Sequence, residues 1–78
     1  MSAVYEIMGR PGCPECVRAK NVADREGVEY VYVDLDQSPE AMERAVATGK
    51  RQLPFIFKDE EYIGSTNEMV SDITVSNF

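Results

Sequence analysis

Two cysteines separated by two residues constrain this chain more than any other feature. Cys13 and Cys16 are the only cysteines among 78 residues, and they stand in the run Gly-Cys-Pro-Glu-Cys at 12–16. In a reducing compartment, a C-x-x-C pair at the start of a helix predicts a redox-active dithiol. The same spacing also occurs in structural disulfides and in one half of a metal site shared by two chains. Both alternatives stay open at this point.

The composition excludes several other kinds of chemistry. The chain has no histidine, which excludes Cys–His and Ser–His–Asp catalysis within one chain and any histidine-based metal site. Two cysteines are too few for the all-cysteine zinc site of a monomer, which needs four thiolates. The net charge is −6, and phosphate binding needs clustered cations, so we expect no nucleic-acid partner.

Length and hydropathy predict a single soluble domain over residues 1–78. No apolar run approaches the roughly 18 residues that a membrane helix needs. The N-terminus also lacks the basic-then-apolar layout of a signal peptide. We therefore expect a cytoplasmic protein with no membrane partner. We also expect it to be a monomer.

Hydrophobic patterning and helix-boundary signals predict the element order β-α-β-α-β-β-α. Gly27 is expected to close the first helix, and Ser38 with Pro39 to open the second, which Gly49 ends. Ser65 and Glu68 have the spacing of a capping box for the third helix, whose end the β-branched run 73–75 leaves open. The strands are expected at 3–8, 29–34, 54–57 and 61–63, and the first helix at 14–26.

The connections between these elements predict a mixed sheet. Strand–helix–strand units imply parallel pairing with right-handed crossovers, whereas the short turn at 58–60 implies an antiparallel hairpin. The result is an α/β fold, a four-stranded mixed sheet flanked by helices. The tyrosines and phenylalanines of the strands, Tyr32 among them, are expected to pack against this sheet.

The start of the first helix predicts the roles of the two cysteines. Cys13 falls near the N-cap and Pro14 at the first helical position, where unpaired N–H groups and the helix dipole favour a negative sulfur. A free thiol has a pKa of about 8.5, which such sites lower. We expect Cys13 to attack disulfides and the less exposed Cys16 to resolve the mixed disulfide. Glu15 opposes a thiolate by charge repulsion, whereas Arg10 favours it.

The chain resembles the glutaredoxin family and its NrdH-type redoxin relatives. The resemblance covers the active-site stretch 12–16, the element order, the run Ser-Pro-Glu-Ala at 38–41, and Gly-Lys-Arg-Gln-Leu-Pro at 49–54. It implies a thioredoxin-like fold and a dithiol thiol–disulfide oxidoreductase that reduces protein or glutathione mixed disulfides. It also implies that Pro54 is cis and faces the cysteines, with the backbone N–H and C=O of Leu53 free to pair with a substrate strand.

The resemblance further implies a set of glutathione contacts. In this family a basic residue stands three before the first cysteine and another near the cis-proline, and a Gly-Gly is followed by a polar pair. Ser65 stands where the second glycine of that motif is usual. The residues of this chain that match, together with the proline between the cysteines, are Arg10, Pro14, Arg51, Leu53, Pro54, Thr66 and Asn67.

Two electron donors remain open. The resemblance implies glutathione as co-substrate, with no tightly bound cofactor, and ribonucleotide reductase as one client. An NrdH-type redoxin would instead be reduced by thioredoxin reductase, but such proteins usually carry Ser-Gly-Phe-Arg-Pro-Asp where this chain has Ile-Gly-Ser-Thr-Asn-Glu at 63–68. A dimer that bridges a metal or iron–sulfur cluster through Cys13 and Cys16, and a redox-inert domain binding a partner along Leu53 and Pro54, are the alternatives of another class.

Overall fold

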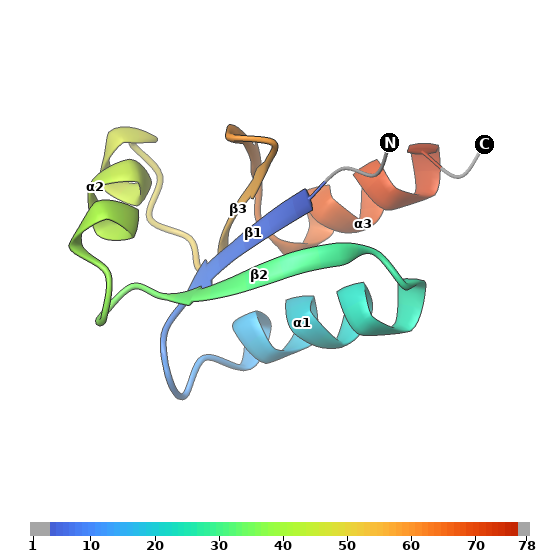
Figure 1. Cartoon of the computed structure of the whole chain (residues 1–78), viewed down its shortest axis with the longest axis horizontal. Helices are drawn as coiled ribbons and strands as arrows, with labels where there is room; N and C mark the ends of the chain where they lie inside the picture. The colour runs from blue at the N-terminus through green and yellow to red at the C-terminus, as the bar shows by residue number, and fades with distance from the viewer. Residues whose placement is uncertain (1–3, 77–78) are drawn as a thin grey trace.

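One mixed sheet and three helices make up the fold in the computed structural model, which describes residues 4–76 (Figure 1). The predicted order of elements is confirmed. None of the helices within residues 4–76 is long and apolar enough to cross a membrane. In chain order the elements are β1 (Val4–Gly9), α1 (Pro14–Glu26), β2 (Glu29–Asp34), α2 (Pro39–Ala47), β3 (Phe55–Lys58), β4 (Glu61–Gly64) and α3 (Thr66–Ser76).

The sheet has the strand order β2-β1-β3-β4. The central strand β1 pairs in parallel with β2 and antiparallel with β3, and β3 pairs antiparallel with β4. This is the pairing that a crossover followed by a hairpin predicts. The Gly9 carbonyl at the end of β1 accepts a 2.8 Å hydrogen bond from the Leu35 N–H, which holds the chain just after β2 beside the end of β1.

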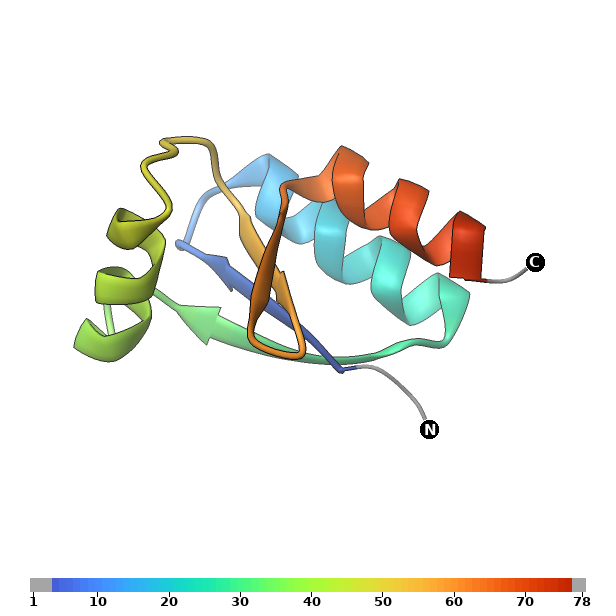
Figure 2. The same ribbon diagram turned by 90° about the horizontal axis from the view of Figure 1, so that it is seen from above.

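The three helices divide between the two faces of the sheet. Helices α1 and α3 lie side by side on one face, and α2 covers the other (Figure 2). Successive side chains of a strand point to opposite faces, so Ile7 packs under α1 and α3 while Met8 packs under α2. Ile56 and Phe57 divide in the same way on β3. One apolar core thus holds α1 and α3 against the sheet, and a second holds α2 against its other face.

Several predicted boundaries are off by one or more residues. Strand β1 ends at Gly9 instead of residue 8, and Ala3 lies outside the described residues. Strand β3 begins after Pro54, which has no N–H to donate to a ladder, and extends through Lys58. The hairpin turn is therefore only Asp59 and Glu60, both with positive φ.

The observed ends of α2 and α3 differ from the predicted ones, whereas the end of α1 agrees. Helix α2 ends at Ala47 with Thr48 as its cap, whereas Gly49 was the expected end. Helix α3 continues through the β-branched run 73–75 to Ser76, because Ile73 is buried in the core between α1 and the sheet. Gly27, with φ of 69°, caps α1 as predicted.

A hydrogen-bonded cluster attaches α3 to the sheet. The Tyr5 hydroxyl and the Lys58 ammonium both donate to the Asp72 carboxylate, the latter over 2.8 Å. These hydrogen bonds lower the pKa of the Asp72 carboxyl, and burial together with the Asp72 contact raises the pKa of Tyr5. The cluster holds α3 in place, and α3 begins at the active site.

Replacing Asp72 should destabilise the fold in a pH-dependent way. Because the pKa of this carboxyl is lowered on folding, its contribution is present above its unfolded pKa of about 3.9 and is lost as the pH falls through the folded value. We expect Asp72→Asn to lower the free energy of unfolding at neutral pH by about 1–3 kcal/mol, measured by urea denaturation. The gap to the unmodified protein should narrow in acid. Asp24→Asn, at an exposed carboxylate bonded to Tyr30, is the control and should cost less. A gap that is equal at all pH values would contradict the account.

Candidate active site

The two cysteines form a disulfide at the first turn of α1. Their Cα atoms are 5.2 Å apart. Cys13 is the N-cap with extended backbone, Pro14 is the first helical residue, and the Cys16 N–H donates to the Cys13 sulfur over 3.1 Å. Cys13 is half-buried, whereas Cys16 is 0% exposed. An incoming thiol can therefore reach Cys13 far more easily than Cys16.

The charged neighbours of the disulfide are each paired with another group. Glu15 lies 2.9 Å from the Arg18 guanidinium, and Arg10 lies 3.4 Å from the Asp36 carboxylate. All four side chains are exposed to solvent, which weakens any effect they have on a nearby sulfur. The two opposing influences expected from Glu15 and Arg10 are thus both reduced. The N–H groups and dipole at the start of α1 remain as the dominant stabilisation of a sulfur anion.

Three chain segments meet at the start of α1. The Leu53–Pro54 peptide is cis, as the family resemblance implies, and Pro54 is fully buried. The Thr66 hydroxyl, at the start of α3, donates to the Glu15 carbonyl over 3.3 Å. The Ser65 hydroxyl donates to the Leu53 carbonyl, also over 3.3 Å. The first turn of α1, the start of α3 and the loop at 48–54 that precedes β3 (the proline loop) form one connected unit.

The backbone of Leu53 differs from the expectation in one respect. Its carbonyl was expected to be free for a substrate strand, but it already accepts the hydrogen bond from Ser65. A carbonyl oxygen has a second lone pair, so it can still accept from a substrate amide. None of the turn, loop and cap hydrogen bonds within residues 4–76 uses the Leu53 N–H.

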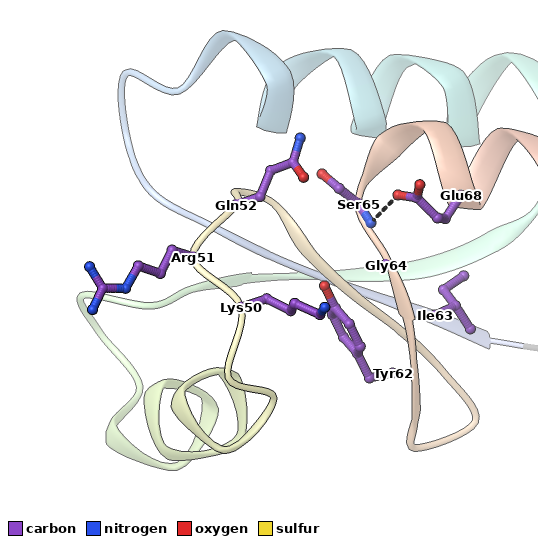
Figure 3. Close-up of a pocket in the computed structure, with 8 residues that line it drawn as sticks. All are labelled: Lys50, Arg51, Gln52, Tyr62, Ile63, Gly64, Ser65 and Glu68. Atoms are coloured by element: carbon purple, nitrogen blue, oxygen red, sulfur yellow. Dashed lines mark hydrogen bonds between the residues drawn. The ribbon is translucent and has the colours of Figure 1, made fainter.

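Only one half of the predicted capping box forms. The Glu68 carboxylate accepts from the Ser65 N–H over 2.8 Å, as the dashed line in Figure 3 shows. The Ser65 hydroxyl, which the motif would direct to the helix backbone, instead contacts Leu53. A Cβ at the preceding Gly64 would come within 2.5 Å of the Glu68 side chain, so the contact of Glu68 with the Ser65 N–H leaves no room for a larger residue there.

The predicted polar pair at the start of α3 divides between the interior and the surface. The Thr66 side chain is 1% exposed, so its hydroxyl serves the contact between α1 and α3. Asn67 is exposed, and its side-chain oxygen accepts from Arg18 over 3.3 Å. Sequence reasoning missed Arg18, which links both helix starts. The spacing of Glu15 and Arg18, three apart on a helix, is the signal that could have indicated half of its role.

Two hollows adjoin the proline loop. The larger, of about 770 Å³, lies between that loop and the edge strand β4, and in Figure 3 the Arg51 side chain points away from the other residues that line it. The smaller, of about 220 Å³, brings Arg10, Lys50, Arg51 and Leu53 together over an apolar floor. Two residues predicted from separate parts of the sequence, Arg10 and Arg51, thus share one hollow. The lining of the larger hollow consists of Lys50, Arg51, Gln52, Tyr62, Ile63, Gly64, Ser65 and Glu68.

A metal centre would need ligands beyond the two cysteines. Within residues 4–76, no group of three or more histidine, cysteine, aspartate and glutamate side chains is arranged to hold a metal ion. Cys13 and Cys16 are bonded to each other. A cluster bridged between two chains would need this disulfide reduced and four sulfurs from two copies.

The sequence is similar to known glutaredoxins over most of its length. Residues 4–63 match the family model described as Glutaredoxin. A protein of Synechocystis sp. named "Probable glutaredoxin" is 41% identical over 71 residues, in an alignment that covers 88% of this chain and 81% of that protein.

Solved structures of glutaredoxins and of a glutaredoxin-like protein are also similar to this chain. NrdH-redoxin from Escherichia coli, a glutaredoxin-like protein with a thioredoxin-like activity profile, has a TM-score of 0.77 at 26% identity, covering 88% of this chain and 92% of that one. Buckwheat glutaredoxin, solved in complex with glutathione, has a TM-score of 0.74 at 25% identity, covering 92% of this chain and 69% of that one. With a cysteine pair able to form a disulfide at the start of α1 and a family match over residues 4–63, this chain belongs to the glutaredoxin family of thiol–disulfide oxidoreductases.

Proposed function

We propose that the chain reduces protein and glutathione mixed disulfides by dithiol exchange and is itself reduced by glutathione. The observation that carries this proposal is the half-buried sulfur of Cys13 at the N-cap of α1, bonded to the fully buried Cys16. One sulfur is placed to attack and to be attacked, and the other is shielded from competing thiols.

The exchange proceeds in two displacements. The Cys13 thiolate attacks one sulfur of the client disulfide, a mixed disulfide forms, and the other client sulfur leaves as a thiolate with the electron pair. The Cys16 thiolate then attacks the Cys13 sulfur, closes the disulfide and releases the second client sulfur, also as a thiolate. The client gains two electrons and the cysteine pair loses two. Two equivalents of glutathione reverse these steps and leave as glutathione disulfide.

Positive charge near the proline loop supports glutathione as the donor. Glutathione carries two carboxylates, and the smaller hollow has Arg10, Lys50 and Arg51 around it, although the chain as a whole is acidic. Arginine suits carboxylate recognition because its planar donors can pair with both oxygens. The exposed Asn67 amide and the Leu53 N–H would add contacts to the backbone of the tripeptide. We propose that the exposed Pro14 makes an apolar contact with the substrate beside the reacting sulfurs, and that the buried Pro54 holds the Leu53 backbone with which the substrate pairs.

The remaining features of the proposal follow from the chemistry of the dithiol. A pair that must return to the reduced state works in a reducing compartment, so we propose a cytoplasmic location. Exchange needs one copy of the chain, so we propose a monomer. Ribonucleotide reductase, a protein that needs dithiol reduction, is the client proposed from the family resemblance.

The two cysteines should respond differently to substitution. Cys13→Ser removes the attacking sulfur, so we expect turnover to fall to the uncatalysed background with every disulfide substrate. Cys16→Ser should lose reduction of protein disulfides but retain part of the activity on glutathione mixed disulfides, because glutathione itself can complete that reaction. Turnover can be followed by NADPH oxidation coupled to glutathione reductase. Activity that survives Cys13→Ser would rule out the proposed exchange.

The donor can be identified by reconstitution. With NADPH, we expect glutathione plus glutathione reductase to regenerate the dithiol and thioredoxin reductase to do so poorly. The opposite preference would identify an NrdH-type redoxin.

The purified protein should be colourless, free of bound metal and monomeric in sedimentation, since a coloured dimer that contains metal would favour the bridged-cluster alternative.

The basic residues of the smaller hollow should affect binding more than chemistry. Arg10→Gln and Arg51→Gln should each raise KM for a glutathione mixed disulfide about two- to fivefold and leave kcat nearly unchanged, as expected for exposed ion pairs. The control is Arg25→Gln at the far end of α1, where the arginine pairs with Glu26. The increase in KM caused by Arg10→Gln and by Arg51→Gln should be smaller at high salt. If the KM of all three variants equalled that of the unmodified protein, Arg10 and Arg51 would not be part of the binding site.

A further inference from the structure

The hydroxyl of Tyr32 lies beside the buried sulfur of Cys16. The evidence comes from Gly9, the last residue of β1, which separates β2 from α1 at this point. A Cβ placed on Gly9 would be 2.6 Å from the Cys16 sulfur and 2.6 Å from the Tyr32 hydroxyl oxygen. The Cys16 sulfur and the Tyr32 hydroxyl oxygen therefore lie within about 5 Å of each other, next to a glycine that has no side chain. Any residue larger than glycine would separate them.

Cys16 needs such a neighbour in the exchange reaction. In each direction its sulfur carries negative charge, as the attacking thiolate or as the leaving thiolate, and this charge develops at a position that is 0% exposed. A buried anion without a hydrogen-bond donor is costly. The Cys16 N–H is not available, because it already donates to the Cys13 sulfur.

The Tyr32 hydroxyl is available to supply this hydrogen bond. Within residues 4–76 the Tyr32 hydroxyl makes no hydrogen bond, whereas the hydroxyls of Tyr5 and Tyr30 each donate to an aspartate. Burial, aided by the charge of Asp34, raises the pKa of Tyr32, so the phenol stays protonated and remains a donor at neutral pH. The Lys20 ammonium lies 4.6 Å from the centre of the Tyr32 ring and adds positive charge on the side of α1.

We propose that Tyr32 is a positioning residue for the second displacement, whose hydroxyl donates a hydrogen bond to the Cys16 sulfur whenever that sulfur is a thiolate. When the Cys16 thiolate attacks Cys13, the new S–S bond forms as the bond from Cys13 to the client sulfur breaks, and the client leaves with the electron pair. When a donor thiolate attacks Cys13, the electron pair of the Cys13–Cys16 bond passes to Cys16. In both directions the phenol keeps its proton and stabilises the charge.

This inference rests on the proposed dithiol exchange but not on the identity of its electron donor. It predicts a step-specific effect, because Tyr32 acts on Cys16 and has no part in the attack by Cys13. Reduction of a glutathione mixed disulfide through Cys13 alone should therefore be unaffected by the loss of the hydroxyl. Closure of the disulfide by Cys16 should be slowed.

The test compares Tyr32→Phe with Tyr30→Phe. Both changes remove one hydroxyl and keep the ring, and Tyr30 lies on the same strand with its hydroxyl bonded to Asp24 at the surface. Loading Cys13 with thionitrobenzoate and following release of the coloured thiolate gives the rate of ring closure by Cys16. We expect Tyr32→Phe to slow this release about threefold at neutral pH, because a rise of about one unit in the Cys16 pKa lowers the thiolate fraction tenfold while the remaining thiolate becomes more nucleophilic. Tyr30→Phe should leave the release unchanged.

A second measurement reports on the Cys16 thiol directly. In the Cys13→Ser background, the NMR chemical shift of the Cys16 β-carbon as a function of pH gives the pKa of that thiol. Adding Tyr32→Phe should raise this pKa by about one pH unit, and adding Tyr30→Phe should not. This titration does not depend on turnover, so it stands even if the proposed electron donor is wrong. An unchanged Cys16 pKa together with an unchanged closure rate, in a variant that melts at the temperature of the control, would overturn the proposal.

Discussion

The hydrogen bond from the Cys16 N–H to the Cys13 sulfur is the interaction on which the rest of this site depends. It exists because Cys13 is the N-cap of α1, with extended backbone, while Cys16 is already one turn inside the helix. The same turn supplies the free N–H groups and the positive end of the dipole that favour a sulfur anion. Moving either cysteine by one position would remove that arrangement.

The fold holds this helix start from three sides. Gly9 at the end of β1 lets the Cys16 sulfur approach the sheet, Thr66 bonds the first turn of α1 to the start of α3, and Ser65 bonds α3 to the proline loop. Nearly two turns further along α3, Asp72 is held by the sheet through Lys58. The attacking sulfur of Cys13 is thus half-buried at the start of α1, and the resolving sulfur of Cys16 is fully buried.

The sequence predicts local features of this protein better than contacts between distant segments. The N-caps at Cys13 and Ser38 and the left-handed cap at Gly27 follow from residue types at fixed offsets, and each is confirmed. The end of α3 did not follow, because the β-branched run 73–75 disfavours a helix while burial of Ile73 maintains one. The predicted start of β3 is one residue too early, because the pattern alone does not show that Pro54 precedes the hydrogen-bonded ladder.

For the candidate site, too, the sequence predicts single residues but not the contacts between distant segments. The two cysteines could be named from their spacing, and Arg10 and Arg51 from the family resemblance. The hydroxyl of Tyr32 beside Cys16 could not, since it depends on the parallel register that places Tyr32 opposite Ile7, and on the absence of a side chain at Gly9. The contact of Ser65 with the Leu53 carbonyl likewise joins residues 12 apart that no local motif connects.

The pKa of the Cys13 thiol in the reduced, folded protein tests this account most directly. It can be measured as the pH dependence of the rate at which iodoacetamide alkylates Cys13, since Cys16 is buried and reacts slowly. The account predicts a midpoint clearly below the value of about 8.5 for a free thiol, because the first turn of α1 stabilises the anion. A midpoint at or above that value would mean that the helix start does not activate this sulfur.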